Sequence, residues 1–462
     1  MTEDADRNAE AGTKGRSING DVIVIGGGLS GLVAASRLAE AGAAVRLFER
    51  RPELGGRVRS EHVDGFTLDR GFQVLFTSYP AVQRELDVDA LDIRPFAPGA
   101  TICRPGSRAV LSDPLRDPRH AFESAFNHEI PFVDKLRTLA LRYDLGKRDE
   151  ATAFSDPDTS IREYLDDWGF SDVYIDRFVA PFYGGITLDR TLSTSKHVFE
   201  YTFHAMSRGQ IGVPASGMGA IATQLAMRAR DAGVEIHTGE NVQAIDVGSE
   251  SNRGLGTRFT LGSGGLAAGA RVQFADESTA DADLVVVATT SPEARRLTGL
   301  ESIPEAGVGC VTQWYTLPEH LSFETGHRIL LNAVDGAPNT IVPMSEVAPT
   351  YAPDDQALLA ATFLGDPAQD RSTDDLRATT IETLSEWYPE RGFEGLTVLG
   401  THRTPFAQFA QPPGIHATLP SPADPDGPVV LAGEYTEWAS IQGALESGCR
   451  AAAVGVESLA GR

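Results

Sequence analysis

The chain carries a glycine-rich turn between a short apolar run and an alanine-rich segment near its start. Residues 21–25 read Asp-Val-Ile-Val-Ile, and Gly26, Gly28 and Gly31 follow in the spacing G-x-G-x-x-G before a helix predicted over 32–41. Glycines in this pattern allow a tight turn and a close approach of backbone to phosphate, and the positive helix N-terminus faces that phosphate. The motif predicts an α/β domain that binds a dinucleotide pyrophosphate.

An acidic residue follows at the distance that a dinucleotide requires. Residues 44–49 form the next predicted strand, which ends in Glu49, 18 residues beyond Gly31. A carboxylate about 20 residues after the glycines accepts a hydrogen bond from a ribose hydroxyl. An accidental glycine turn is the alternative explanation of the motif, and Glu49 weighs against it.

A second glycine pair follows soon after the ribose acid. Gly55 and Gly56 precede Arg57, so more backbone and a guanidinium would lie along the same pyrophosphate. These are more contacts to the pyrophosphate than NAD usually receives. A nicotinamide dehydrogenase is disfavoured, because NAD alone would leave this block without a ligand.

Length, charge and cysteine usage limit the possible functions. With 462 residues, two domains are expected, interleaved in sequence. The formal net charge of −24 argues against nucleic acid as a partner, because binding it requires basic patches. Cys103, Cys310 and Cys449 form no C-x-x-C pair, so neither a disulfide framework nor a dithiol centre is indicated, and a cytoplasmic location is expected. No metal site is predicted.

The order of the patterns predicts the domain boundaries. Residues 1–20 are polar and are expected to form a disordered tail without a signal peptide, and no stretch is apolar enough to span a bilayer. The cofactor domain is assigned to 21–80, 208–290 and 425–462. The substrate domain is assigned to 81–207, as a mostly helical lobe whose many aromatic residues are interpreted as core, and to 291–424, as strands with a helix near 374–387.

The second half returns to an α/β pattern. Gly217-Met-Gly219 introduces a helix to about residue 232, and strands are predicted at 234–238 and 241–247. Residues 283–288 form a buried parallel strand that ends in Ala288 and Thr289, small enough for close packing against a cofactor. The glycine-rich stretch 262–269 is interpreted as a flexible hairpin loop, because no helix-length segment follows it.

The last block contains a strand, Gly433-Glu434 and a final helix. Ser440 is predicted as its N-cap. The free N–H groups after Ser440 would face the carboxyl edge of the sheet, where ligands bind in such folds.

On these residues the chain resembles the flavin-containing amine oxidoreductase superfamily, and within it the phytoene (carotenoid) desaturase-like and protoporphyrinogen oxidase-like members. The resemblance covers most of residues 20–460 and is most specific in four ordered blocks, at 22–73, 217–219, 288–289 and 432–448. It implies non-covalent FAD in a Rossmann-type α/β domain, with an interleaved α+β substrate domain of a mixed sheet and a helical lobe.

The resemblance also implies which residues hold FAD. The glycines of the first turn would contact the pyrophosphate, Glu49 the ribose and Val242 the adenine, while the N–H groups of Ile441 and Gln442 would face flavin N1 and O2, where a helix N-terminus stabilises negative charge. The predicted cofactor-binding residues are Gly26, Gly28, Leu29, Ser30, Gly31, Glu49, Arg50, Gly56, Arg57, Gly71, Phe72, Gln73, Val242, Ala288, Thr289, Gly433, Glu434, Ser440, Ile441 and Gln442.

Two departures from the family pattern bear on the substrate. Amine oxidases of the superfamily keep a lysine that holds a water near the flavin, and no lysine occurs from 197 to 462. They also have an aromatic ring beside the flavin at the position where this chain has Ser440. Both departures count against amine oxidation. His402 is interpreted as a structural histidine and not as a covalent flavin link.

The leading hypothesis is an FAD-dependent oxidoreductase that removes hydride from a C–H bond of an apolar substrate, as a carotenoid desaturase does. Gln73 and Ser440 are the candidate catalytic residues, although the whole segment 71–74 could instead contact the cofactor through its backbone. The alternatives are an amine or protoporphyrinogen oxidase using oxygen, and a redox-neutral isomerase or flavin-bound scaffold. Oxygen or a quinone is the expected electron acceptor. With a quinone or carotenoid, peripheral membrane contact through an apolar patch near 90–210 is expected.

Overall fold

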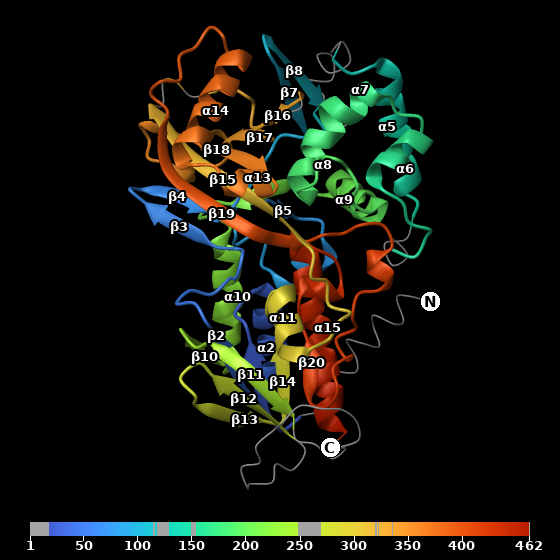
Figure 1. The fold of residues 1–462 in the computed structure, drawn as a ribbon, viewed down its shortest axis with the longest axis vertical. Helices are drawn as coiled ribbons and strands as arrows, with labels where there is room; N and C mark the ends of the chain where they lie inside the picture. Colours follow the sequence, from blue (N-terminus) through green and yellow to red (C-terminus); the bar gives the residue numbers. More distant parts are fainter. Residues whose placement is uncertain are drawn as a thin grey trace.

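The computed structural model describes residues 18–113, 116–117, 129–148, 154–247, 269–318, 321, 323–334 and 336–461. The N-terminal tail, except residues 18–20, and the glycine-rich stretch 262–269, except Gly269, lie outside the described residues, so both predictions stay untested. Figure 1 shows two units stacked along the long axis, with a parallel sheet in one and a larger sheet beside a helical lobe in the other.

A five-stranded parallel sheet forms the first unit, in the order β10-β2-β1-β14-β20. Its strands are β10 (Glu235–Thr238), β2 (Ala44–Glu49), β1 (Asp21–Ile25), β14 (Leu284–Val287) and β20 (Val429–Leu431). Strand β1 can be central because it is apolar and buried from Val22 to Ile25. Val22 and Val24 pack on one face of the sheet, and Ile23 and Ile25 on the other.

Helices and a small sheet cover the two faces. The helices on the first face are α2 (Leu29–Glu40), α10 (Gly219–Asp231) and α15 (Ile441–Ala460). Against the second face pack α11 (Ser291–Thr298) and an antiparallel sheet of β11 (Val242–Val247), β12 (Ala270–Phe274) and β13 (Thr279–Ala282). These elements confirm the predicted α/β pattern, although α2 begins three residues earlier than expected.

A seven-stranded sheet organises the second unit. Its order is β19 (Thr397–Phe409), β15 (Gly307–Pro318), β18 (Gln356–Leu364), β17 (Thr340–Pro343), β16 (Ile329–Asn332), β7 (Gly99–Arg104) and β8 (Ser107–Ser112). Among the strand pairs of this sheet that the described residues form, only β16 and β7 run parallel. Helix α14 (Thr373–Trp387) confirms the helix predicted near 374–387, and it packs Leu376, Leu384 and Trp387 against one face of this sheet. The short helix α13 (Asp366–Gln369) packs Ala368 into the same core.

The helical lobe lies beside this sheet (Figure 1). It consists of α5 (Phe132–Leu145), α6 (Ile161–Asp167), α7 (Asp172–Tyr174), a π turn at Ile175–Val179, α8 (Ala180–Thr187) and α9 (Lys196–Arg208). Ser160 caps α6 through a complete capping box with Glu163. A buried aromatic cluster that includes Tyr183 and Phe199 joins these helices.

The prediction that 81–207 is mostly helical is wrong for its first part. After α3 (Pro80–Glu85), the chain forms β6 (Ile93–Pro95), and then β7 and β8 as the edge hairpin of the seven-stranded sheet. The hairpin turns at Pro105-Gly106, where Gly106 has φ +68°, and this dipeptide is the local turn signal that the helical interpretation overlooked.

Short elements connect the two units. Strands β5 (Leu75–Phe76), β9 (Ile211–Pro214) and β6 form one three-stranded sheet, and β3 (Ser60–Val63) pairs with β4 (Phe66–Asp69). The chain also forms α12 (Met344–Val347). Among the described residues, no helix combines the length and apolar character needed to cross a bilayer. The exact domain boundaries stay a prediction.

Candidate functional site

One cavity of about 1250 Å³ runs between the two units. It reaches from the carboxyl ends of β1 and β2 to the helices α5, α8 and α9. Its volume exceeds the ~300–1,000 Å³ of an ordinary small-molecule site. The space is therefore large enough for a long ligand, or for a cofactor and a substrate together.

The three glycines of the first turn have different surroundings. Gly28 is the N-cap of α2 without a side-chain cap, and a Cβ added to it would meet no atom within 4 Å, so its face is open to the cavity. A Cβ on Gly31 would lie 2.0 Å from the carbonyl oxygen of Gly26. Gly31 is therefore needed for the close packing of turn and helix, and it lies behind the cavity wall.

The carboxylate of Glu49 is fixed by backbone donors at the end of β2. Its two oxygens accept from the N–H of Gly27 at 2.8 Å and from the N–H of Arg51 at 3.0 Å. The side chain of Glu49 is buried and lines the cavity. Arg50 and Val242 also line it. A carboxylate held in this way presents its remaining lone pairs in a defined direction.

An ion pair joins the first and last sequence blocks inside the cavity. The guanidinium of Arg57 donates to Glu434 Oε1 at 2.6 Å and to the carbonyl oxygen of Ala407 at 2.6 Å. Burial raises the pKa of Glu434, and Arg57 opposes that increase. The amide of Gln73 donates to the carbonyl oxygen of Arg57 at 3.3 Å, so its side chain supports the same pair.

The last helix begins at the cavity. Ser440 Oγ accepts from the N–H of Gly443 at 2.8 Å, which confirms the predicted N-cap. Ser440 and Ile441 line the cavity. The side chain of Gln442 is buried outside the cavity lining, where its oxygen accepts from the N–H of Ala81 at 2.8 Å.

Most of the predicted cofactor residues lie around this one cavity. Gly31 and Gln442 do not line it; the others do, and they are Gly26, Gly28, Leu29, Ser30, Glu49, Arg50, Gly56, Arg57, Gly71, Phe72, Gln73, Val242, Ala288, Thr289, Gly433, Glu434, Ser440 and Ile441.

Sequence reasoning missed the far half of the lining. Aromatic residues of the helical lobe were interpreted as core, yet several form an apolar chamber that we define as Leu136, Phe178, Phe182, Ile186, Phe203 and Met206. The helical spacing of these residues is the same for a core and for a chamber wall, so the sequence carries no signal that separates the two.

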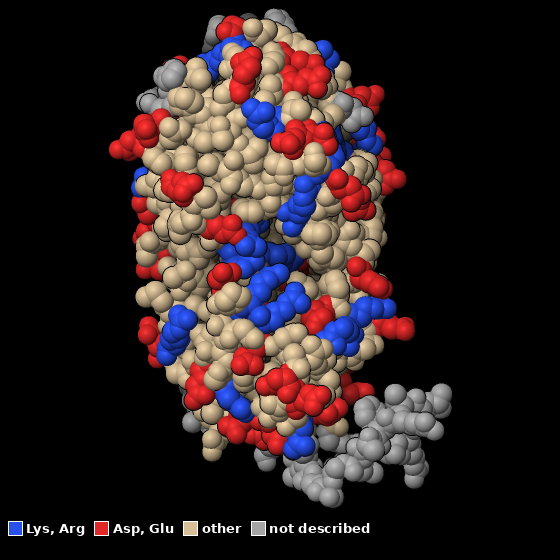
Figure 2. All heavy atoms as spheres, turned by 60° about the vertical axis from the view of Figure 1, so that its left-hand side comes forward, with Lys and Arg blue, Asp and Glu red and all other residues tan. Residues whose placement is uncertain are grey.

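Basic residues also line the cavity, although the chain is acidic overall. Figure 2 shows Lys and Arg gathered around a hollow at mid-height of the molecule, amid mixed and acidic surface. The lining includes Arg51, Arg57, Arg59, Arg70 and Arg403. Positive charge around a cleft attracts anionic groups such as phosphates.

His402 lies in the same lining. Its Nδ1 is 3.0 Å from the carbonyl oxygen of Asp69, and its Nε2 is 3.3 Å from Glu61 Oε2. Both nitrogens are therefore engaged with protein groups. Trp314 Nε1 donates to the same Asp69 carbonyl at 3.1 Å, which ties β15 to the end of β4.

The residues at the first end of the cavity fit a dinucleotide. An uncapped helix start, an open glycine face and a fixed carboxylate are arranged along one wall, and arginines lie nearby. Together with the parallel sheet, they define a dinucleotide-binding α/β protein whose cavity continues into a second chamber.

Comparison with known proteins identifies the family. The pattern of the flavin containing amine oxidoreductase family matches residues 29–454, so the chain belongs to this family. It is an FAD-dependent oxidoreductase by this membership, as the resemblance implied.

Curated relatives match over a short region only. The chain is 55% identical over 51 residues to carotenoid 3,4-desaturase of Haloarcula japonica, which is 11% of this chain and 10% of that protein. It is 48% identical over 63 residues to carotenoid phi-ring synthase of Streptomyces griseus, 13% and 12% of the two chains. The match thus spans about a tenth of the length of these relatives.

Solved structures share the fold over nearly the whole chain. A putative protoporphyrinogen oxidase from Exiguobacterium has a TM-score of 0.68 at 16% identity, covering 95% of this chain and 98% of that one. Cyclohexylamine oxidase from Brevibacterium oxydans has a TM-score of 0.63 at 18% identity, covering 96% and 99%. These likenesses confirm the fold class.

Proposed function

We propose that the chain binds FAD in this cavity and removes hydride from a C–H bond of an apolar, extended substrate of the carotenoid class. The observation that carries the proposal is the continuity of the site. The cofactor end and the apolar chamber belong to one cavity, and the helix start at Ser440 and Ile441 forms part of its lining.

The chain's own residues would hold and orient the cofactor. The N–H groups at the start of α2 would bind the pyrophosphate, Glu49 the ribose, and the start of α15 the flavin ring. Bound flavin supplies the two-electron acceptance that these side chains lack. The N-terminus of α15 would favour negative charge beside it without rearrangement, because Ser440 already fixes the first turn.

The apolar chamber favours a substrate without charge. Phe178, Phe182 and Met206 expose carbon and sulfur to the cavity, and such walls exclude water. Gln73 also lines the cavity, but its amide donates to the carbonyl oxygen of Arg57. We therefore assign Gln73 a positioning role for Arg57.

The lysine pattern disfavours amine oxidation. The lysine that lines the cavity is Lys135 on α5, in the helical lobe, and no lysine follows residue 196. Burial lowers the pKa of Lys135. A lysine on this helix is not at the sequence position at which amine oxidases of the superfamily keep theirs.

We further propose that the substrate enters from a membrane surface along α5. Phe132, Leu136, Leu139 and Tyr143 follow one another at helical spacing, and their side chains are 60%, 51%, 39% and 70% exposed. The first three also line the cavity, so an exposed apolar face lies at its rim. Such faces insert into a lipid interface. Oxygen or a membrane quinone would then accept the electrons.

Protoporphyrinogen-type oxidation is the second candidate, because basic residues lie at the same end of the cavity as the apolar chamber. Arg116, Lys135 and Arg142 line it and could face substrate carboxylates. Arg116 already donates to the carbonyl oxygen of Gly209 at 2.5 Å, and Arg142 to Asp113 at 2.5 Å. Because these partners use much of their hydrogen-bonding capacity, the apolar substrate is favoured.

Anaerobic reduction tests the proposal. Flavin-loaded protein is mixed separately with a polyene in detergent micelles, a porphyrinogen and simple amines, and the oxidised flavin absorption is followed. Bleaching by the polyene, with a product of longer conjugation, is expected. Bleaching by amines or porphyrinogen alone would contradict the proposal. Polyene conversion without bleaching and without an acceptor would instead indicate a redox-neutral isomerase.

A further inference from the structure

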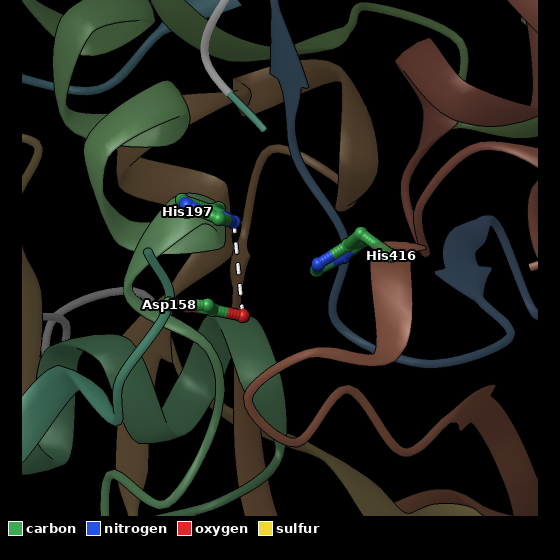
Figure 3. Close-up of side chains that lie close together, drawn as sticks. All are labelled: Asp158, His197 and His416. Atoms are coloured by element: carbon green, nitrogen blue, oxygen red, sulfur yellow. Dashed lines mark ion pairs between the residues drawn. The ribbon is translucent and has the colours of Figure 1, made fainter. Parts of the chain in front are cut away.

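Three side chains outside the cavity converge on one point. Asp158, His197 and His416 place one ligating atom each within 4.8 Å of the others (Figure 3). His197 lies on α9, Asp158 precedes α6, and His416 belongs to a short 3-10 helix at Ile415–Ala417. None of the three lines the cavity described above.

The two imidazoles carry buried nitrogens that have no hydrogen-bond partner among the described residues. His197 is 2% exposed, and within this part of the chain neither its Nδ1 nor its Nε2 has such a partner. The Nδ1 of His416 is also buried and unpartnered. Burying such atoms unpaired costs free energy, so they are usually satisfied by a partner, an ordered water or an ion. His197 Nδ1 is 3.7 Å from Asp158 Oδ2, beyond hydrogen-bond distance.

Outer partners orient two of the three ligands. Asp158 Oδ1 accepts from Ser195 Oγ at 2.9 Å, and Oδ2 accepts from the N–H of Gly414 at 2.7 Å. His416 Nε2 is 3.3 Å from Gln411 Oε1. This oxygen also accepts from the N–H of Ala439 at 2.9 Å, so it acts as an acceptor and His416 Nε2 carries the proton. The lone pair is then on Nδ1.

We propose that Asp158, His197 and His416 bind one divalent transition-metal ion, with Zn²⁺ the ion that fits best. Two imidazoles and one carboxylate suit zinc, whereas Mg²⁺ and Ca²⁺ prefer oxygen ligands. A carbonyl oxygen behind a ligating histidine is the usual outer partner in such sites. Donors that lie ~2.0–2.1 Å from a tetrahedral ion are about 3.4 Å from one another. On binding, the three side chains would therefore move about 1 Å closer together, and a water would complete the coordination.

The ion would brace the loop that leads to the last helix. It would link α9 and the segment before α6 to His416, and Gln411 connects His416 to Ala439. Ala439 immediately precedes Ser440, the cap of α15 at the cavity. The role assigned to the site is therefore structural: it holds the start of α15.

Metal titration of the tag-free, full-length protein tests this site. After chelator treatment and dialysis, Zn²⁺ alone is added and binding is measured by calorimetry and elemental analysis. We expect saturable uptake of about one ion per chain and a higher Tm. Co²⁺ in place of Zn²⁺ should give visible absorption of an imidazole-bound ion in the unsubstituted protein, and this readout needs no variant.

Matched variants locate the ion. His197→Gln and His416→Gln should each weaken Zn²⁺ binding at least about tenfold, since each removes a ligand. His204→Gln removes another buried histidine of α9, one that bonds to Leu145, and should leave binding unchanged. Absence of saturable Zn²⁺ uptake and of a Co²⁺ spectrum in the unsubstituted protein would overturn the proposal. Equal loss of binding in all three variants would also overturn it.

Discussion

Arg57 and Glu434 are 377 positions apart in the chain, yet Arg57 Nη1 lies 2.6 Å from Glu434 Oε1. The pair joins the segment after the ribose acid to the segment before the last helix. Both residues line the cavity, and the side chain of Glu434 is only 10% exposed. A carboxylate at such depth depends on its cation, because an unpaired buried charge is costly.

Removing the cation Arg57 should therefore lower the free energy of unfolding more than removing the charge of its partner, Glu434. Arg57→Met leaves Glu434 buried and unpaired, and we expect the free energy of unfolding to fall by about 3 kcal/mol. Glu434→Gln should cost less, and combining the two substitutions should recover part of the loss. Denaturant unfolding of flavin-free protein measures all three variants.

Arg70→Met is the control for the Arg57 experiment. Arg70 pairs with Glu61, and these side chains are 43% and 35% exposed, so the pair contributes at most about 1 kcal/mol. Equal effects of Arg57→Met and Arg70→Met would contradict the importance assigned to the buried pair.

Two glycine substitutions should separate cofactor binding from folding. In Gly31→Ala, the new methyl would meet the carbonyl oxygen of Gly26 at 2.0 Å, so we expect poor folding. In Gly28→Ala, the methyl meets no protein atom within 4 Å but enters the cavity, so the fold should survive while flavin affinity falls at least about tenfold. Circular dichroism and flavin titration check both outcomes. Undiminished flavin affinity in Gly28→Ala would contradict the placement of the pyrophosphate.

Charges on α5 should abolish membrane contact. Phe132→Glu with Leu136→Glu places two carboxylates on the exposed apolar face, and we expect sedimentation with neutral lipid vesicles to fall about tenfold. Met227→Glu is the matched control, because Met227 is 58% exposed on α10, outside the cavity lining. If the unsubstituted protein does not sediment at any salt concentration, or if Met227→Glu has the same effect, α5 is not a membrane face.

Asp69 should make stability depend on pH below neutrality. Burial raises the pKa of Asp69 to about 6, although Ser60, Met218 and Tyr351 donate to its carboxylate. The folded protein holds this proton more tightly than the unfolded chain, whose Asp pKa is near 3.9. The stabilisation from this group is therefore complete below about pH 4 and is lost as pH rises to 6.

Asp69→Asn removes this titration. The free energy of unfolding of Asp69→Asn minus that of the unsubstituted protein should therefore increase by up to about 3 kcal/mol between pH 4 and pH 7, because only the unsubstituted protein loses this contribution. Urea unfolding at both pH values measures the difference. A difference between the two proteins that does not change with pH would show that Asp69 has an ordinary pKa.

The dinucleotide half of the fold was predictable because its signals are local. The strand, glycine turn, helix and Glu49 follow one another within 30 residues, and Ser440 is a recognisable cap whose side chain accepts from Gly443. Each of these positions depends on neighbours close in sequence. The structure accordingly shows most of them at one cavity.

The rest of the site depends on contacts that the sequence pattern does not encode. Phe178 and Phe203 have the spacing of core residues, and only the packing of the π turn at Ile175–Val179 and of α9 leaves them facing a chamber. His197 and His416 are far apart in sequence and share no ligand motif, so their meeting with Asp158 is visible only in three dimensions. The hairpin of β7 and β8 was missed because aromatic spacing elsewhere in the segment dominated the interpretation.

The cofactor content of the purified protein is the decisive test of FAD binding in this cavity. The full-length protein is purified without added cofactor, its visible spectrum is recorded, and the flavin released by heat is identified and quantified after reconstitution with FAD. We expect a yellow protein that holds about one non-covalent FAD per chain, with at least about tenfold weaker binding in Gly28→Ala. A correctly folded protein that is colourless and does not take up added FAD would contradict it.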